Sequence, residues 1–337
     1  GVAAWVGAWW IVQEPAHTGP IWATKQTASS QPHVEADLPW AEHEAAATDA
    51  LSGFGRHARA AGWAHPDAAV SAEELVRALG SDQLVVLDIR PAERFEEGHL
   101  PTAQPLEAKA LGEKLDGVGL AASTDVLVEA LRTRGVDRGD VVVLYGDGGP
   151  EPYRVWWTLR ERTGIEARVL DGGLQGWAAL GAPVPAGAAE APPRGDVNAS
   201  DTRGVTWTWD ALQARLHGSE ALLVDTRTPD EHKGTIQHPG ATRAGRIPGS
   251  RNVPWNSILV GPDDPSLRPL DDLQRDLAPF LQGERPVVTW CQSGNRSSAV
   301  YYALLQAGLS PERLYNYDGS WAEYSRSDRP LETCATC

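Results

Sequence analysis

A cysteine between a strand and a helix is the residue of this sequence with the clearest capacity for chemistry. Residues 287–290 (VVTW) form a short apolar run typical of a buried strand, Cys291 follows directly, and a polar loop leads into a helical stretch at 299–308. Loop amides and the first free N–H groups of a helix converge at such a place, and the helix dipole adds partial positive charge. That environment favours the thiolate, which is the nucleophilic form of cysteine.

An isolated cysteine is usually a buried structural thiol, which is the competing interpretation of Cys291. Its position favours a functional role instead, because open α/β sheets bind their ligands at the carboxyl ends of their strands. We therefore predict that Cys291 is a nucleophile.

The elements that must position this cysteine are indicated by an internal repeat. Ser71 with acidic residues after it predicts a capped helix start, and apolar runs then end in Asp88 and, in the second half, in Asp225. The matching segments are 84–90 with 222–227, 98–101 with 245–248, 141–145 with 286–290, 156–159 with 301–304, and 171–177 with 318–324. Five matches in one order indicate a duplicated unit. Since each half alternates strands with helices, we expect two α/β domains, each a parallel sheet flanked by helices.

Composition divides the chain further. We expect an irregular N-terminal extension at 1–67, a first domain at 68–181, a Pro-, Gly- and Ala-rich linker at 182–203, a second domain at 204–330 and a tail at 331–337.

The bulk properties exclude some partners. The formal net charge of -15 over 337 residues argues against nucleic acid, which needs a basic face, and suits a soluble monomer. Small anionic substrates stay possible, because clustered arginines can reverse the field inside a cleft. The apolar run at 1–12 is shorter than the roughly 20 residues of a membrane span. It is either a buried or docked tail, with a cytoplasmic location slightly favoured, or a signal or anchor remnant, which would indicate an exported protein.

The order of these motifs resembles the tandem rhodanese family over about residues 68 to 330. The resemblance rests on strand-end aspartates, a Gly-x-Ile-Pro-Gly element at 245–249, the cysteine loop at 291–296 and the Asp-Gly-Ser-Trp at 318–321. Family members have a catalytic C-terminal domain and an inactive N-terminal one. Gly146 stands opposite Cys291 in the repeat, so the first domain is expected to be non-catalytic.

The resemblance implies a transferase, a thiosulfate sulfurtransferase that works without cofactor or metal. Cys291 would take sulfane sulfur from a small anionic donor as a persulfide and pass it to cyanide or to a thiol acceptor of the thioredoxin-like kind. The loop residues would stabilise the anionic sulfur; they are Gln292, Ser293, Gly294, Asn295, Arg296 and Ser297. Four cations are expected to bind the donor: Arg296, Arg243, Arg246 and Lys233, the last at a place where relatives often have arginine. Asp225 and Arg227 should be structural, because Asp88 and Arg90 recur in the inactive half.

Other functions remain open. A 3-mercaptopyruvate sulfurtransferase would use the same thiol, although the basic Arg296 favours thiosulfate. A Cys-based phosphatase has one residue more between cysteine and arginine than the four found here. A cysteine protease needs a nearby histidine base, and none of the nine histidines lies in the loop. The presence of Cys291 argues against a non-catalytic sulfur-binding module.

Cys334 and Cys337 form a Cys-x-x-Cys pair outside the family motifs. The pair could be half of a zinc site, but no second ligand pair is evident. It could also be two thiols of a flexible tail that bond to each other. The remaining hypothesis is a redox pair that takes sulfur from Cys291 or reduces its persulfide.

Overall fold

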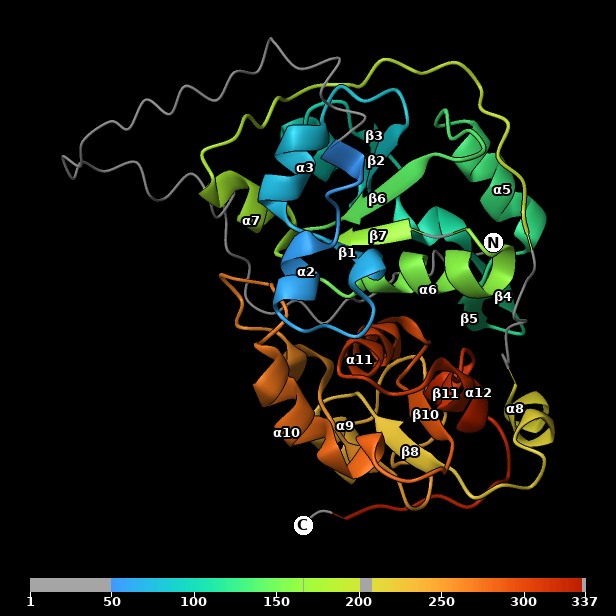
Figure 1. The fold of residues 1–337 in the computed structure, drawn as a ribbon. Helices are drawn as coiled ribbons and strands as arrows, with labels where there is room; N and C mark the ends of the chain where they lie inside the picture. The colour runs from blue at the N-terminus through green and yellow to red at the C-terminus, as the bar shows by residue number, and fades with distance from the viewer. Residues whose placement is uncertain (1–49, 166, 201–207, 335–337) are drawn as a thin grey trace, which may run out of the picture. The chain divides into compact units, whose positions relative to one another are not determined.

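The structure is a computed structural model that describes residues 50–165, 167–200 and 208–334 (Figure 1). The first domain is built on a five-stranded sheet of order β1-β7-β6-β2-β3, whose strands are all parallel. Its strands are β1 (Ala69–Val70), β2 (Leu84–Asp88), β3 (Gln104–Pro105), β6 (Val141–Tyr145) and β7 (Ala167–Leu170). Its helices are α2 (Arg56–Ala60), α3 (Ala72–Ala78), α4 (Ala92–Glu97), α5 (Thr124–Arg132), α6 (Glu151–Thr163) and α7 (Gly173–Ala179). A hairpin of β4 (Gly112–Leu115) and β5 (Val118–Ala121) stands apart from the sheet.

The second domain repeats this plan on a four-stranded parallel sheet of order β11-β10-β8-β9. Its strands are β8 (Leu222–Asp225), β9 (Arg251–Asn252), β10 (Val287–Trp290) and β11 (Leu314–Asn316). Its helices are α8 (Trp209–Arg215), α9 (Pro229–Lys233), α10 (Leu270–Leu281), α11 (Asn295–Gln306) and α12 (Ser320–Tyr324). The apolar central strands are covered on both faces, as parallel sheets require. The expected fold class is therefore confirmed.

The register of the central strands reproduces the repeat. Asp88 lies opposite Tyr145 at the end of the β2–β6 pair, and Asp225 lies opposite Trp290 at the end of the β8–β10 pair. Cys291 therefore leaves the sheet beside the strand end that carries Asp225.

Three apolar residues that precede the predicted start of the first domain at residue 68 pack into the core. Phe54, Ala58 and Trp63 were assigned to the irregular extension, yet they are 1%, 2% and 7% exposed and belong to the packed core. The helix α2 and a 3₁₀ turn at Pro66–Ala68 connect them to β1. The apolar run at 1–12 lies outside the described residues.

The chain between the domains has no helix or strand over residues 182–200. It follows the first domain closely, because the Val197 amide donates to the Val136 carbonyl at 3.2 Å and Arg132 Nε donates to the Val197 carbonyl at 2.8 Å. Within the described part of the chain, no helix combines the length and apolar character of a membrane span.

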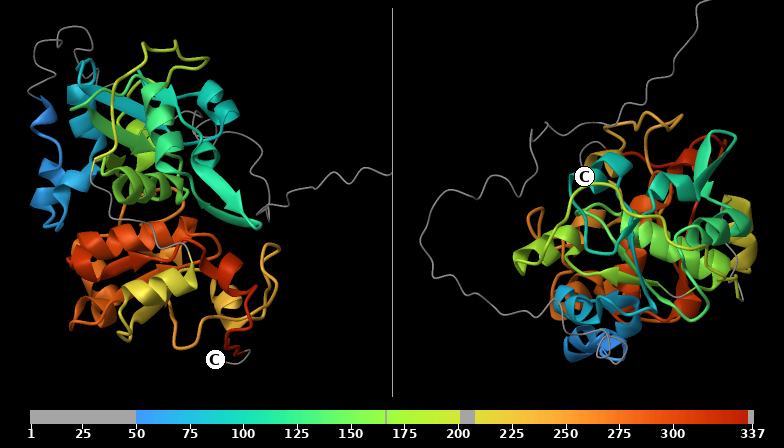
Figure 2. Two further views of the ribbon diagram at one scale, coloured as in Figure 1. Left: turned by 90° about the vertical axis from the view of Figure 1, so that its right-hand side faces the viewer. Right: turned by 90° about the horizontal axis from the view of Figure 1, so that it is seen from above.

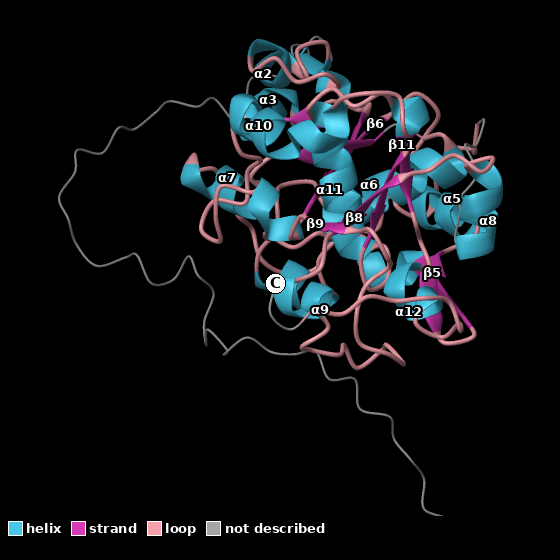
Figure 3. Cartoon of the chain, turned by 90° about the horizontal axis from the view of Figure 1, so that it is seen from below, coloured by secondary structure: helices cyan, strands magenta, loops and turns pink. Residues whose placement is uncertain are grey.

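The two domains meet through α6 and α11, which lie between the two sheets (Figure 1) and remain next to each other in the other views (Figures 2 and 3). The Trp156 ring meets the Tyr302 ring edge-on, with centroids 4.9 Å apart. Two reciprocal hydrogen bonds also join the domains, the first part-buried and the second buried. The Leu267 amide donates to Asp171 of the first domain at 2.9 Å, and the Ala121 amide donates to Asp318 of the second at 3.0 Å.

Candidate active site

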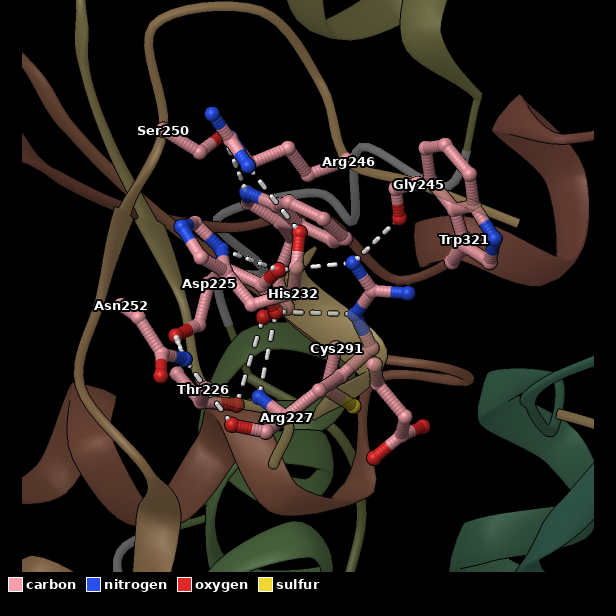
Figure 4. A network of polar contacts seen from close by, with 12 residues as sticks. Asp225, Thr226, Arg227, His232, Gly245, Arg246, Ser250, Asn252, Cys291 and Trp321 are labelled. Carbon is pink, nitrogen blue, oxygen red and sulfur yellow. Dashed lines mark hydrogen bonds and ion pairs between the residues drawn. The ribbon is translucent and has the colours of Figure 1, made fainter. Parts of the chain in front are cut away.

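Cys291 lies at the carboxyl end of β10, just before the amino end of α11 (Figure 4). It is a free thiol, and the residue is only 1% exposed. The first N–H groups of α11, at Asn295, Arg296 and Ser297, have no carbonyl within the helix to bind. A negatively charged sulfur at the loop centre would therefore meet unsatisfied donors and the positive end of a 12-residue helix.

Ser320 fixes the shape of the catalytic loop, which we define as residues 291–296. Its hydroxyl oxygen accepts the amides of Cys291 and Gly294, at 3.1 and 3.2 Å, and its proton goes to the Tyr317 carbonyl at 2.6 Å. Ser320 is fully buried and has a left-handed backbone with φ of 49°. The Trp321 amide next to it donates to the Cys291 carbonyl at 3.0 Å. The start of α12 thus holds the loop at Cys291 and at Gly294.

Gly294 is a position that only glycine can occupy. Its φ is 76°, and a Cβ there would lie 2.5 Å from Arg154 Nη1 and 2.8 Å from Asp318 Oδ1. The left-handed conformation turns the loop into α11, and the missing side chain lets the first domain approach the loop directly.

Polar side chains beneath the loop bind each other. Ser297 Oγ donates to Asn316 Oδ1 at 2.6 Å, Asn316 Nδ2 donates to Ser298 Oγ at 3.0 Å, and Ser298 Oγ donates to the Gly294 carbonyl at 2.7 Å. The Ser297 side chain therefore supports the loop from within the domain.

Arg296 is paired with a carboxylate that sequence reasoning missed. Its Nη1 and Nη2 donate to the two oxygens of Glu231 on α9, at 2.7 and 2.9 Å. Burial would raise the pKa of Glu231, but the hydrogen bonds and charge of Arg296, together with the Thr228 amide, lower it to about 2. Burial would likewise lower the pKa of Arg296, but Glu231 and the negative charge of Cys291 raise it. Arg296 thus lies within electrostatic range of the sulfur and is already partly neutralised.

The strand-end pair Asp225 and Arg227 forms the buried network that Figure 4 shows. Arg227 Nε and Nη2 donate to Asp225 at 2.9 and 2.7 Å, and Nη2 also donates to the Gly245 carbonyl at 2.8 Å. The guanidinium lies 4.5 Å from the centroid of the Trp290 ring and 4.9 Å from that of Trp321. These contacts agree with the structural role that we expected.

The same network recurs in the first domain. Arg90 Nη2 donates to Asp88 and to the Gly98 carbonyl, both at 2.6 Å. Where the second domain has Cys291 after Trp290, the first has Gly146 after Tyr145. The first domain therefore has the same network but no thiol at this position.

Two of the other predicted donor-binding cations, Arg243 and Arg246, have protein partners for their side chains. Arg243 donates to the carbonyls of Ser325 and Arg329, at 2.9 and 3.1 Å, which ties the end of the domain together. Arg246 donates to the His232 carbonyl at 3.2 Å and pairs with Glu332 at 3.2 Å. Lys233 ends α9, and its carbonyl accepts the Cys334 amide at 2.8 Å. No contact among the described residues brings Arg243 or Arg246 to Cys291.

Two residues of the first domain support the catalytic loop, and sequence reasoning missed both. Arg154 on α6 pairs with the buried Asp318 at 2.5 Å and lies against Gly294. Asn295 Nδ2 donates to Glu151 Oε1 at 3.0 Å, and burial raises the pKa of Glu151. The domain without a thiol therefore supports the loop of the domain that has one.

The side chain of Gln292 has a free acceptor. Among the described residues, its buried Oε1 has no hydrogen-bond partner. Its Nε2 lies close to Gly240, in the segment where the Gly240 amide donates to His238 Nδ1 at 3.1 Å. Burial lowers the pKa of His238.

Cys334 is disulfide-bonded, and Cys337 lies outside the described residues. The redox pair predicted from the sequence is therefore visible only at its first cysteine.

Fold and site define a duplicated α/β protein with one strand-end thiol facing a helix amino terminus. The rhodanese-like domain matches residues 71–180 and again 208–327, and the chain belongs to the rhodanese family of sulfurtransferases. It is 31% identical to a thiosulfate sulfurtransferase of Corynebacterium glutamicum, over 80% of this chain and 92% of that one. It is 28% identical to the 3-mercaptopyruvate sulfurtransferase of Escherichia coli K12, over 78% and 97%. It is also 28% identical to the sulfur carrier protein TtuD of Thermus thermophilus, over 78% and 95%.

Among solved structures, wild-type EanB superimposes with a TM-score of 0.69 at 22% identity, over 81% of this chain and 70% of that one. The anaerobic ergothioneine biosynthesis enzyme of Chlorobium limicola gives a TM-score of 0.67 at 23% identity, over 80% and 71%. At these identities the likeness shows the shared fold alone.

Proposed function

We propose that this protein transfers sulfane sulfur from thiosulfate to a nucleophilic acceptor through a persulfide on Cys291. The Cys291 thiolate attacks the outer sulfur of thiosulfate, the S–S bond of the donor breaks, and sulfite leaves with the electron pair. Cyanide or an acceptor thiolate then attacks the outer sulfur of the persulfide. Thiocyanate or an acceptor persulfide forms, and the Cys291 thiolate returns.

The observation that carries this proposal is the position of Cys291 before the amino terminus of α11, inside a loop held from two sides. Ser320 fixes the loop amides, while Arg154 and Glu151 fix its far end. Such donors stabilise a sulfur anion that stays negative in both half-reactions, so no separate base is needed. Each sulfur transfer exchanges one thiolate-like anion for another.

Thiosulfate is favoured as the donor by Arg296 and by the relatives. Arg296 interacts electrostatically with Cys291, and its Glu231 partner holds the guanidinium in one orientation. Thiosulfate sulfurtransferases of Azotobacter vinelandii and Pseudomonas aeruginosa are each 30% identical to this chain, over 77% and 78% of it. The relative from Escherichia coli keeps 3-mercaptopyruvate as the second candidate donor.

Intact mass of the fully reduced protein before and after thiosulfate tests the chemistry. The wild type should gain one sulfur atom that cyanide removes, whereas Cys291→Ser should gain none. Cys334→Ser is the matched control, because it also removes one thiol but should still gain sulfur. Parallel reactions with 3-mercaptopyruvate rank the donors by rate. A folded wild type that gains no sulfur from either donor contradicts the proposal, and phosphate-ester hydrolysis by that sample would indicate a phosphatase.

A further inference from the structure

The buried carboxylate of Asp225 binds a second side chain besides that of Arg227. Nδ1 of His232, on α9, lies 2.9 Å from Asp225 Oδ2 (Figure 4). The side chains of His232 and Asp225 are 14% and 0% exposed. Because an ionised carboxylate can only accept hydrogen bonds, Nδ1 of His232 carries a proton and donates it. The strand end of the catalytic domain is therefore attached to α9 by a side-chain hydrogen bond.

The first domain satisfies its matching carboxylate from a different element. The Tyr145 hydroxyl, at the end of β6, donates to Asp88 Oδ2 at 2.5 Å. Seven positions after Asp88, where the second domain has its histidine, stands Phe95 on α4. Phe95 is 2% exposed and belongs to the apolar core of its domain. In the domain without a thiol, the second partner of the aspartate thus comes from the central strand.

The catalytic domain has the opposite arrangement. Trp290 stands where the first domain has its tyrosine, and its Nε1 donates to Ser250 Oγ at 3.1 Å. His232, seven positions after Asp225, supplies the hydrogen bond that the tyrosine supplies in the first domain. The helix α9, and not the strand β10, therefore completes the carboxylate network of the domain that has the thiol.

The same helix holds the cation of the catalytic loop. Glu231 accepts Arg296 Nη1 and Nη2 at 2.7 and 2.9 Å. Its carboxylate also accepts the Thr228 amide at 3.1 Å, and Thr228 Oγ1 accepts the Glu231 amide at 3.2 Å, which closes a capping box at the start of α9. One carboxylate therefore joins the first turn of α9 to Arg296.

The orientation of α9 depends on contacts outside the helix. A helix of five residues is far too short to be stable on its own, so its neighbours must hold it in place. Glu231 and His232 are consecutive, and successive helical side chains point in different directions. Glu231 reaches the catalytic loop, whereas His232 reaches the strand end. His232 is thus the attachment of α9 to the buried network, and Glu231 is its attachment to Arg296.

We propose that His232 is a positioning residue for the sulfur donor, because its hydrogen bond to Asp225 fixes α9 and thereby the Glu231–Arg296 pair at the catalytic loop. This inference rests on the proposed function, in which Arg296 binds the anionic donor. His232 acts through Arg296 and not on the reacting sulfur. Its loss should therefore weaken binding of thiosulfate and leave the chemistry at Cys291 in place.

The rate of persulfide formation at increasing thiosulfate concentrations tests this inference. Quenched-flow mass spectrometry of the full-length reduced chain yields a half-saturating concentration and a limiting rate. His232→Phe gives α9 the residue that α4 has, and it should raise the half-saturating concentration at least about tenfold, since it removes a hydrogen bond to a charged group. The limiting rate should stay near that of the wild type, because binding alone is weakened. His232→Leu is a second apolar variant with a smaller side chain.

Two comparisons distinguish positioning from a merely structural role. His232→Asn should restore the wild-type half-saturating concentration, because Nδ2 of asparagine takes the place of Nδ1. Tyr145→Phe removes the corresponding hydrogen bond to Asp88 in the first domain, so it should lower stability in urea unfolding without changing the half-saturating concentration. In a chain that already has Glu231→Gln, addition of His232→Phe should change that concentration less than about threefold, since both residues act through Arg296.

The outcomes separate this inference from the proposed function. Folded His232→Phe and His232→Leu with the half-saturating concentration of the wild type would overturn the positioning role. An equal rise in His232→Asn or in Tyr145→Phe would overturn it too, as would a full tenfold effect on top of Glu231→Gln. In all these cases the persulfide still forms and the sulfurtransferase stands. A wild type that gains no sulfur at any thiosulfate concentration overturns the proposed function itself.

Discussion

The ion pair between Glu231 and Arg296 allows a quantitative test, the substitution Glu231→Gln. Glutamine keeps the shape of the side chain but removes the charge, so Arg296 remains 19% exposed without its counter-ion. The fall of the Glu231 pKa from 4.5 to about 2 corresponds to roughly 3 kcal/mol, since a tenfold change in proton affinity is worth about 1.4 kcal/mol. Breaking a buried pair by removing one partner costs about 3–5 kcal/mol, which agrees in size.

The lowered pKa of Glu231 also predicts how the stability difference depends on pH. Because the folded-state pKa of Glu231 lies below the unfolded value, its contribution is complete above about pH 4.5 and is lost as the pH falls through about 2. We therefore expect Glu231→Gln to lower the free energy of unfolding by about 3 kcal/mol at pH 7, and the gap to the wild type should close at low pH.

Urea unfolding of the second domain, followed by tryptophan fluorescence at pH 7, 5 and 3, measures the difference, and Glu284→Gln is the exposed control. A loss below about 0.5 kcal/mol at pH 7, the range of ordinary surface substitutions, would refute the reasoning. A difference in unfolding free energy between variant and wild type that stays constant with pH would refute it as well.

Three further predictions concern the interface and the loop. Arg154→Leu leaves the buried Asp318 without a cation and should lower the free energy of unfolding by about 3–5 kcal/mol in urea titrations; a change under about 1 kcal/mol would contradict the role of this pair. Ser320→Ala removes the common acceptor of two loop amides and should slow persulfide formation on Cys291 by at least about tenfold in quenched-flow mass spectrometry; an unchanged rate would show that the amides need no fixing. Burial raises the pKa of Asp171 to about 6, so its contribution to stability is complete below about pH 3.8 and is lost as the pH rises through 6. Asp171→Asn should therefore raise the thermal midpoint at pH 8 and leave it unchanged at pH 4, and a gain at pH 4 would argue against titration of this group.

Local sequence patterns were sufficient to predict most of the fold. The apolar runs ending in Asp88, Asp225 and before Cys291 were visible because buried parallel strands are short and continuously apolar. Ser71 was visible as a helix start, and it forms a full capping box with Glu74. These signals need only neighbouring residues, so one sequence suffices to find them.

The residues that pair with the site residues could not be predicted from local patterns. Glu231 and Arg296 are separated by 65 positions, and Arg154 and Asp318 come from different domains. Charge alone suggested that Arg243 and Arg246 would face a donor, but the carbonyls and the carboxylate that bind them appear only once the chain is folded. The sequence shows which side chains are charged, whereas the structure shows which of them are paired with other groups of the protein.

The reciprocal hydrogen bonds of the domain interface make each half structurally dependent on the other. Asp171 and Asp318 occupy matching places in the repeat, and each takes an amide proton from the opposite half. The first domain has Gly146 where the second has Cys291, yet it takes full part in this mutual support. Deletion of the first domain would leave the buried Asp318 carboxylate without its partners and would expose the aromatic surface of α11. The half without a nucleophile is therefore constrained in its shape by the half that it supports.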